Sequence, residues 1–361
     1  MRMKKKITFI TSGIGTGGAE RQLALLAGGL RDRGFKPTII SLSAAPNPLP
    51  EFENLETYVC PLEKGLGSPR RFLKLWKKIR QLEPDIIQGW MYAGNLLASI
   101  LAIGLKPPRV FHSVRASNMD SARYGRQIRL NGLASHFSRA TIFNSEAGMD
   151  FHKNMGFSAS NLQLIPNGID TDKFSPEPRL RDVLRRNLGF ASGDKVVLYV
   201  ARLDPMKGHK TLLDVALACP EYKFVMAGKD TETLEASSNV TCLGACENIA
   251  ELYNAADLLV SISNFGEGFP NVIGEAMACG LHVLANDVGD SRAIIGNTGY
   301  ICASSDAEIV SKQICSIFAR RNNVVKPADP RQRILTSFSC NAMVEAYASL
   351  YQKEMLDHVS K

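Results

Sequence analysis

The order of apolar and polar positions divides the chain into short apolar runs separated by segments with helical spacing. In the first half, apolar runs predict strands, and stretches such as Ala19–Arg31, where leucines recur every three or four residues, predict helices. The predicted strands are Ile7–Thr11, Pro37–Leu42, Asp85–Gln88, Arg109–Ser113, Ala140–Asn144 and Leu162–Ile165, and the other predicted helices are Arg70–Leu82 and Asn95–Ile103. Strands that alternate with helices favour parallel βαβ units.

A proline-marked segment, Phe174–Pro178, predicts a linker, and the alternation then starts again. The second set of strands is Lys195–Val200, Tyr222–Ala227, Leu258–Ile262 and Val283–Ala285, and its helices are Lys210–Ala218, Ile249–Ala255 and Asn271–Cys279. We therefore expect an α/β chain of two Rossmann-like, doubly wound domains, residues 1–173 and 179–338, that face a cleft. The amphipathic segment 339–361 is expected to cross back to the first domain. Ligands bind at the carboxyl ends of the strands in such sheets.

Composition is that of a soluble globular protein, because 45% of the 361 residues are apolar and 22% are charged. No apolar run reaches the roughly 18 residues that a membrane-spanning helix needs. Eight cysteines are scattered, and the one close pair, Cys242 and Cys246, has no second pair at zinc-binding spacing. We expect reduced thiols and a cytoplasmic location.

The net charge of +8 is concentrated in the first half. Residues 1–165 hold 23 basic and 11 acidic side chains, whereas the rest of the chain holds 20 and 24. This asymmetry is equally consistent with an anionic partner and with a solvated basic face. The predicted helix Arg70–Leu82 places cations beside Phe72, Leu75 and Trp76, which suits peripheral binding to an anionic membrane. Its cations are Arg70, Arg71, Lys74, Lys77, Lys78 and Arg80.

A glycine-rich loop, Gly13–Gly18, matches G-x-G-x-x-G between the first strand and the first helix. A nicotinamide site would also need an acidic residue at the end of the second strand, and Ile40–Ser43 has none. The loop therefore predicts close approach of a helix N-terminus to an anion, or simply a tight turn.

Arg202 and Lys207 follow the strand Lys195–Val200, at a position where ligands bind. An arginine fork and a mobile lysine suit a diphosphate, although two solvated loop cations would look the same. A longer segment, Asn264–Gly280, joins a strand to a helix through a loop that contains glycines. Glu267 lies in this loop and Glu275 lies on the apolar helix, where a carboxylate needs a partner.

Together these motifs resemble retaining glycosyltransferases of family 4, which have the GT-B fold and an E-x7-E motif. The resemblance extends from about residue 7 to residue 300 and rests on the set of motifs rather than on one of them. Its landmarks are Gly15–Arg21, Asn144–Ser145, Ile165–Asp170, Arg202 with Lys207–Gly208, Leu243–Gly244, Ala256–Asp257 and the pair Glu267 and Glu275. It implies a UDP-sugar donor, an acceptor hydroxyl on a saccharide or a lipid-linked molecule, and retention of anomeric configuration. Surface polysaccharide, lipopolysaccharide or glycolipid synthesis is the implied setting.

The resemblance also implies roles for individual residues. Arg202 and Lys207 would hold the diphosphate, Glu267 and His112 would contact the transferred sugar, and Glu275 would bind the ribose. Arg115 would contact the acceptor. The remaining donor-binding residues would be Gly17, Gly18, Gly268, Phe269, Pro270 and Asn271. No metal or other cofactor is implied, and we take Asp170-Thr-Asp172 as incidental because no phosphate-binding residue is close to it in sequence.

Two alternatives remain open at this point. One is a nucleotide-sugar epimerase or a sugar phosphorylase on the same fold, which would act without a separate acceptor. The other is a non-enzymatic module that binds anions or nucleic acid. The basic first half favours this module, but the chain shows no interleaved aromatic and basic platform for bases, so we expect no nucleic-acid partner.

Overall fold

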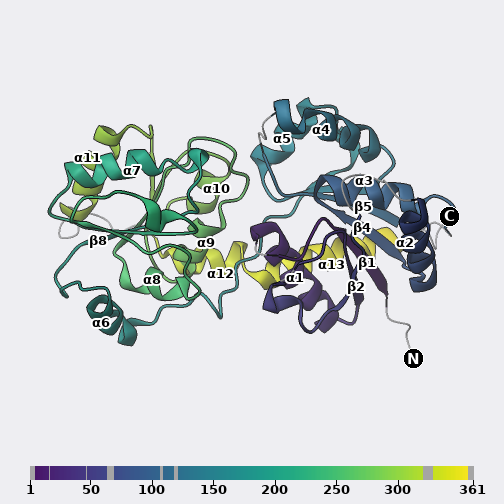
Figure 1. Cartoon of the computed structure of the whole chain (residues 1–361), viewed down its shortest axis with the longest axis horizontal. Helices are drawn as coiled ribbons and strands as arrows, with labels where there is room; N and C mark the ends of the chain where they lie inside the picture. Colours follow the sequence, from purple (N-terminus) through teal and green to yellow (C-terminus); the bar gives the residue numbers. More distant parts are fainter. Residues whose placement is uncertain are drawn as a thin grey trace. The chain divides into compact units, whose positions relative to one another are not determined.

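The structure is a computed structural model that describes residues 5–15, 17–45, 47–62, 69–105, 109–117, 121–319 and 328–356. The chain folds into two compact units, both of the α/β class (Figure 1). Unit 1 comprises Met1–Gly168 and Cys340–Lys361, and unit 2 comprises Ile169–Ser339. Among the described helices, none is long and apolar enough to cross a bilayer.

Unit 1 is built on a parallel seven-stranded sheet in the order β3-β2-β1-β4-β5-β6-β7. The strands are β1 (Lys6–Thr11), β2 (Lys36–Ser41), β3 (Glu56–Val59), β4 (Ile86–Trp90), β5 (Arg109–Val114), β6 (Ala140–Phe143) and β7 (Leu162–Leu164). The helices are α1 (Gly18–Asp32), α2 (Pro69–Leu82), α3 (Met91–Ala102), α4 (Ser121–Ser135), α5 (Glu146–Asn154) and α13 (Cys340–Leu356), with short 3₁₀ turns at Pro50–Phe52 and Ala159–Asn161.

Unit 2 is built on a parallel six-stranded sheet in the order β10-β9-β8-β11-β12-β13. The strands are β8 (Val196–Val200), β9 (Lys223–Ala227), β10 (Val240–Cys242), β11 (Leu258–Ser261), β12 (Val283–Asn286) and β13 (Tyr300–Cys302). The helices are α6 (Pro178–Asn187), α7 (His209–Ala218), α8 (Ile249–Ala255), α9 (Asn271–Ala278), α10 (Ser291–Ile295), α11 (Ala307–Ala319) and α12 (Pro330–Ser337), with 3₁₀ turns η3 (Pro205–Lys207) and η4 (Thr231–Thr233).

Both sheets are covered on their two faces, which explains why their strands read as continuous apolar runs. Successive residues of a strand point to opposite faces. Val196 and Leu198 therefore pack with α8, α9 and α12, whereas Val197 and Tyr199 pack with α7 and α11. In unit 1, Phe9 faces the core shared with α1 and α13, whereas the next residue, Ile10, faces α2 and α3.

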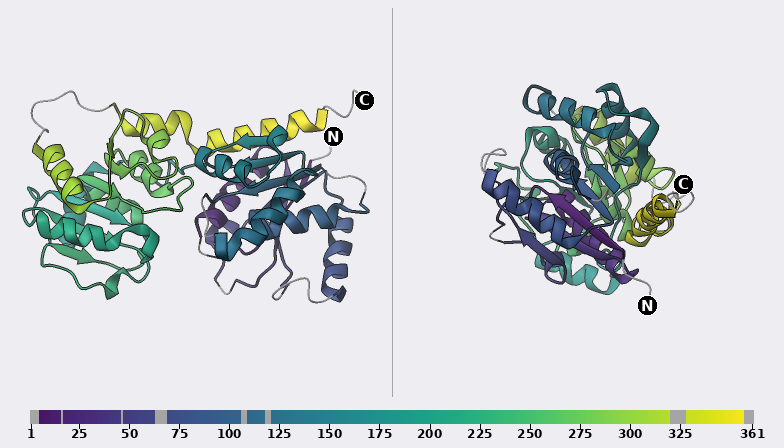
Figure 2. Two further views of the ribbon diagram at one scale, coloured as in Figure 1. Left: turned by 90° about the horizontal axis from the view of Figure 1, so that it is seen from above. Right: turned by 90° about the vertical axis from the view of Figure 1, so that its right-hand side faces the viewer.

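The last helix, α13, lies in the segment predicted to return to the first domain, and it belongs to unit 1, where it runs along α1 (Figure 2). Gly29 of α1 permits this close approach, because a Cβ at that position would lie 2.5 Å from Val344 Cγ2. The buried hydroxyl of Tyr351 donates to the Gln88 side chain of β4. The helix α13 is therefore an integral part of unit 1.

The first boundary between the units differs from the predicted one. The sequence placed residues up to 173 in the first domain, but the structure assigns Ile169 and the residues after it to unit 2. Ile169 N donates to Phe338 O at 2.8 Å, and Phe174 stacks edge-on against Tyr253. The side chains of Ile169 and Phe174 are both buried in the core of unit 2. The last residue of the predicted linker, Pro178, is instead the first residue of α6, where proline suits the first turn of a helix.

Candidate active site

The predicted diphosphate cations lie at the carboxyl end of the unit 2 sheet. All six strands run parallel, so the loops that follow them gather along one edge, where ligands bind in this class of fold. Arg202 and Lys207 follow β8, and Glu267 follows β11, the strand next to β8 in the sheet. The structure thus brings together three of the predicted site residues from distant parts of the chain.

Asp204 organises the loop after β8. Its Oδ1 accepts from Met206 N at 3.0 Å and caps the 3₁₀ turn η3, which ends at Lys207. Its Oδ2 accepts from Arg202 Nε at 3.2 Å and from Arg202 Nη2 at 2.9 Å. Partial burial raises the pKa of Asp204. The hydrogen bond from Met206 N and the charge of Arg202 lower this pKa by more than burial raises it, so it lies below the ordinary value. Asp204 is therefore a carboxylate at this site.

The loops after β8 and β11 are fastened to each other through their backbones. Asn264 N donates to Met206 O at 2.6 Å. Gly208 has φ +74, and a Cβ there would lie 2.5 Å from Ile262 O, so only glycine fits. The hydroxyl of Tyr199, a residue of β8, donates to the Lys207 carbonyl. Burial, and then the Glu267 charge, raise the pKa of this hydroxyl, which stays protonated.

Lys207 and Glu267 form an ion pair between Nζ and Oε1. The same oxygen accepts a hydrogen bond from Ser263 Oγ at 2.6 Å. Sequence reasoning missed Asp204 and Ser263 as members of the site. A signal for Asp204 was present, since an aspartate before Pro205 is a typical N-cap. Nothing in the sequence distinguished Ser263 from other polar residues after a strand.

The loop between Glu267 and α9 is tightly packed. Gly268 O accepts from Asp290 N at 2.9 Å, and Gly289, with φ +62, lets the two backbones approach, since a Cβ there would lie 2.5 Å from Gly268 O. Phe269 is buried against Phe338, with ring centroids 5.6 Å apart. Pro270 precedes Asn271, the first residue of α9. This packing fixes the backbone that carries Glu267.

Glu275 is buried on α9 and has the partner that its apolar surroundings require. Tyr253 Oη donates to Glu275 Oε2 at 2.9 Å, and Glu275 is only 9% exposed. Its ribose role stays a prediction.

The Asp170-Thr-Asp172 string forms a local turn, in which Asp170 Oδ1 accepts from Asp172 N and Lys173 N.

The remaining predicted residues belong to unit 1. Gly17 precedes α1, whose first residue is Gly18. A Cβ on Gly17 would lie 2.0 Å from Glu20 Oε2, so a carboxylate of the chain itself lies against this glycine. That contact disfavours a phosphate next to Gly17 in this conformation, whereas a sugar hydroxyl could donate to the carboxylate.

His112 lies within β5, and Arg115 follows the last residue of that strand, Val114. His112 is fully buried, its Nε2 is 2.8 Å from Ser99 Oγ, and its Nδ1 has no hydrogen-bond partner among the described residues. Burial lowers the pKa of His112 to about 4, so the ring is neutral at pH 7. A contact with sugar would require this ring or its neighbours to move. Arg115 donates to Asn167 Oδ1 at 2.7 Å and to the Tyr347 hydroxyl, and thereby ties β5 to α13.

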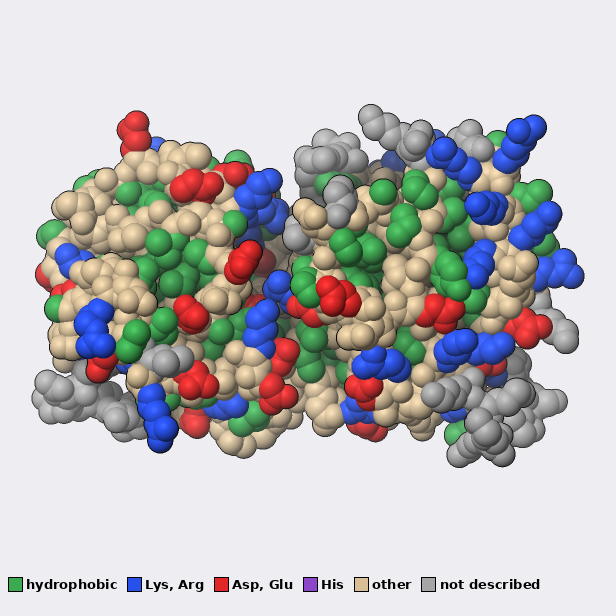
Figure 3. Space-filling model, turned by 60° about the horizontal axis from the view of Figure 1, so that its bottom comes forward, with side chains coloured by type: hydrophobic (Ala, Val, Ile, Leu, Met, Phe, Trp, Pro, Cys, Tyr) green, Lys and Arg blue, Asp and Glu red, His purple; other side chains and the backbone are tan. Residues whose placement is uncertain are grey.

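The helix α2 presents a basic surface next to a groove in unit 1. Basic side chains gather on the right-hand end of the surface in Figure 3, over the region of α2. A groove of about 510 Å³ separates α2 from β3, and Lys78 Nζ lies 3.6 Å from the centroid of the Tyr58 ring in its wall. Its lining is both apolar and basic and comprises Ile40, Tyr58, Val59, Cys60, Pro61, Arg71, Lys74, Leu75 and Lys78.

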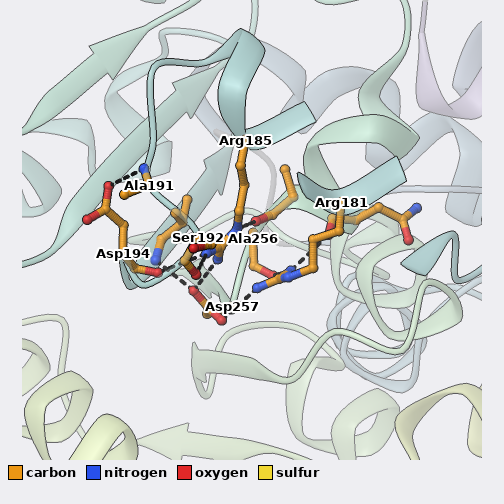
Figure 4. Close-up of polar contacts among 10 residues, drawn as sticks. Arg181, Arg185, Ala191, Ser192, Asp194, Ala256 and Asp257 are labelled. Atoms are coloured by element: carbon orange, nitrogen blue, oxygen red, sulfur yellow. Dashed lines mark hydrogen bonds and ion pairs between the residues drawn. The ribbon is translucent and has the colours of Figure 1, made fainter. Parts of the chain in front are cut away.

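The amino-terminal end of the unit 2 sheet holds a second cluster of charges (Figure 4). Arg185 Nη2 is 2.6 Å from Asp257 Oδ2, and Arg181 Nη2 is 2.7 Å from Asp257 Oδ1. Val196 N, at the start of β8, donates to Asp257 Oδ2 at 2.9 Å. Arg185 also donates to the carbonyls of Ala255, Ser192 and Asp194. This cluster joins α6 to the starts of β8 and β11.

Comparison with known proteins agrees with this arrangement. Residues 16–173 match the family described as Glycosyltransferase Family 4, and residues 181–330 match Glycosyl transferases group 1. N,N'-diacetylbacillosaminyl-diphospho-undecaprenol alpha-1,3-N-acetylgalactosaminyltransferase of Campylobacter jejuni is 25% identical over 349 residues, covering 90% of this chain and 87% of that protein. D-inositol 3-phosphate glycosyltransferase of Mycolicibacterium smegmatis is 28% identical over 217 residues, covering 55% of this chain and 49% of that protein.

Solved structures show the same fold. The crystal structure of Anabaena HepE in complex with UDP-glucose superimposes with a TM-score of 0.84 at 21% identity, covering 96% of this chain and 99% of that one. Sucrose-phosphate synthase from Thermosynechococcus elongatus superimposes with a TM-score of 0.82 at 20% identity, covering 98% and 100%. With two family matches that together span most of its length, the chain belongs to the GT-B glycosyltransferases and combines a family 4 domain with a group 1 domain.

Proposed function

We propose that this glycosyltransferase moves a hexose from a UDP-sugar to an acceptor hydroxyl with retention of configuration. The observation that carries the proposal is the meeting of Arg202, Lys207 and Glu267 at the carboxyl end of the unit 2 sheet. Two cations suit a diphosphate, and an adjacent carboxylate suits sugar hydroxyls. The donor is thus assigned to unit 2.

In this proposal the protein contributes positioning and charge stabilisation. As the bond between sugar and diphosphate breaks, negative charge grows on the leaving diphosphate, and fixed cations stabilise it. Glu267 orients the sugar, and Glu275 binds the ribose. Retention by front-side attack, with the leaving diphosphate accepting the acceptor's proton, fits the family resemblance. It also fits a sequence whose first half offers no obvious carboxylate nucleophile for a covalent intermediate.

The identity of the donor and acceptor is supported by the relatives. Anabaena HepE was crystallised with UDP-glucose, which favours uridine as the base. The name of the Campylobacter jejuni relative describes an acceptor on diphospho-undecaprenol, which favours a lipid-linked acceptor here. We place the reaction in polysaccharide or glycolipid synthesis.

Peripheral membrane binding through α2 follows from such an acceptor. Five cations of α2 are exposed, and the helix carries no acidic residue. A cation near an anionic bilayer contributes about 1 kcal/mol, so several suffice for reversible binding. We place the protein on the inner face of the membrane, in the cytoplasm, where its eight free cysteines would stay reduced. Flotation with anionic and neutral vesicles tests this, and equal recovery with both would contradict it.

A panel of nucleotide-sugars tests the proposed function. Thermal unfolding with UDP-, GDP- and ADP-sugars should show stabilisation by UDP-sugars, and a ligand at 100 times its Kd adds about 2.7 kcal/mol. The stabilising sugar should then be transferred to a lipid-linked saccharide with the anomeric configuration kept. Isomerisation of the donor without an acceptor would instead support an epimerase, and transfer of its sugar to inorganic phosphate would support a phosphorylase. A salt-sensitive complex with plain RNA or DNA, without any nucleotide-sugar binding, would support a nucleic-acid module.

A further inference from the structure

The two proposed diphosphate cations both have carboxylate partners in the structure, but the two pairs are not equally enclosed. Lys207 pairs with Glu267, and their side chains are 19% and 12% exposed. Arg202 pairs with Asp204, and its side chain is 62% exposed. A diphosphate can approach Arg202 from solvent, but it must compete with Glu267 for the ammonium of Lys207.

The backbones around the Lys207–Glu267 pair are fixed, so a change of partner must come from the side chains. Gly289 and Asp290 hold the backbone at Glu267 and Gly268 through close packing and a hydrogen bond of 2.9 Å. The backbone at Lys207 is held in turn by the Tyr199 hydroxyl, which donates to the Lys207 carbonyl. The Glu267 carboxylate also keeps its hydrogen bond from Ser263 Oγ when the lysine leaves, because Ser263 O is itself held by Asn286 Nδ2 at 2.6 Å.

We propose that the donor diphosphate replaces Glu267 as the partner of Lys207, and that this exchange makes the site select intact nucleotide-sugar over free nucleoside diphosphate. The inference rests on the proposed function. A free nucleoside diphosphate takes the lysine and so removes the Lys207 charge from the Glu267 carboxylate, which is unfavourable. A nucleotide-sugar takes the lysine as well, but its sugar hydroxyls then donate to the same carboxylate. The penalty therefore falls on the product and favours its release.

Glu267→Gln tests the exchange, because the amide keeps the shape and an acceptor for Ser263 but removes the charge. We expect the variant to bind UDP about fivefold more tightly than the wild type, because the Glu267 charge no longer competes for the ammonium of Lys207. UDP-glucose should gain less or lose affinity, so the ratio of the Kd of UDP to the Kd of UDP-glucose should fall. Titration calorimetry with UDP and with UDP-glucose measures both constants.

Two controls make the result specific. Glu308→Gln removes the same charge from another lysine pair, Glu308 with Lys312 at 2.5 Å on the exposed face of α11, and should leave both constants unchanged. In a Lys207→Met background, Glu267→Gln should no longer tighten UDP, because there is no ammonium to release. Should Glu267→Gln fail to fold by thermal unfolding, Glu267→Asp shortens the side chain and should shift UDP binding in the same direction.

The outcomes separate this inference from the proposed function. If Glu267→Gln binds UDP no more tightly than the wild type while the wild type binds UDP-glucose, the exchange is wrong and the donor site stands. If the wild type binds neither UDP nor UDP-glucose, the uridine donor is wrong and the exchange fails with it.

Discussion

The two ends of the unit 2 sheet both join arginine to aspartate, yet the two pairs differ in burial and in the number of groups they satisfy. At the amino-terminal end, the side chains of Arg185 and Asp257 are 3% and 5% exposed, and they bind several backbone groups (Figure 4). At the carboxyl end, Arg202 is mostly exposed, and among the described residues its guanidinium hydrogen-bonds only to Asp204.

This difference indicates which end is structural and which is able to bind a ligand. The atoms of the buried pair already bind each other and backbone groups, and loss of one member leaves an uncompensated charge in the core. An exposed pair contributes little to stability, so its members can change partners without loss of the fold. The family landmark Ala256–Asp257 thus supports the sheet, whereas the exposed Arg202 can exchange Asp204 for the proposed donor.

Asp257→Asn should have the largest effect on stability of the substitutions compared here. It leaves Arg185 without a carboxylate in the core, and the expected loss is about 3–5 kcal/mol of the free energy of unfolding. The matched change at the other end, Asp204→Asn, should cost less than about 1 kcal/mol. Urea unfolding of both variants measures the difference, and similar losses for the two would contradict the comparison.

Arg202→Ala should have the largest effect on turnover. Loss of one charged contact to a developing anion costs about 2.7–4 kcal/mol, so kcat should fall about a hundred- to a thousandfold with little change in the KM of the donor. Lys207→Ala should behave similarly, and the two losses should not add. Steady-state kinetics with varied donor settles this, and a variant with wild-type kcat but a raised KM would refute the leaving-group role.

Glu275→Ala should affect donor binding more than turnover. If Glu275 binds the ribose in the ground state and in the transition state alike, its loss should raise the KM of the donor while kcat stays near the wild-type value. Hydrogen bonds to a charged group contribute about 1.5–3 kcal/mol, so we expect at least a tenfold rise. Unchanged constants, measured with a variant that folds normally by thermal unfolding, would exclude the ribose role.

Chelation should have the smallest effect. We propose that Arg202 and Lys207 replace a divalent ion at the diphosphate, so turnover in excess chelator should equal turnover with magnesium. A tenfold loss on chelation, restored by added metal, would show that the two cations do not suffice.

Local sequence signals predicted the parts of the fold and site that depend on short segments. Apolar runs and helical spacing located most strands of both units, and the glycine and proline residues around Glu267 marked the loop before α9. The carboxyl-end rule for parallel sheets then grouped Arg202 and Lys207 with Glu267. These inferences require only that each segment is recognised as a helix or a strand and that the carboxyl end of each strand is known.

The sequence could not predict which side chains become partners across long separations. Lys207 and Glu267 are 60 residues apart, and Tyr253 and Glu275 meet only because α8 packs against α9. The burial of His112 depends on neighbours from α3, and the place of Ile169 depends on residues near the chain end. Such pairings are set by tertiary packing, which no local pattern contains.

Binding of UDP to matched arginine variants tests most directly whether the carboxyl end of the unit 2 sheet is the donor site. UDP carries the charge that develops on the leaving group, so Arg202→Ala should weaken UDP binding at least tenfold by titration calorimetry. Arg181→Ala, which removes an arginine from the opposite end of the same sheet, should leave the Kd of UDP unchanged in protein that is folded by thermal unfolding. The reverse result, with Arg181→Ala weakened and Arg202→Ala unaffected, would contradict the assignment of the donor to this edge.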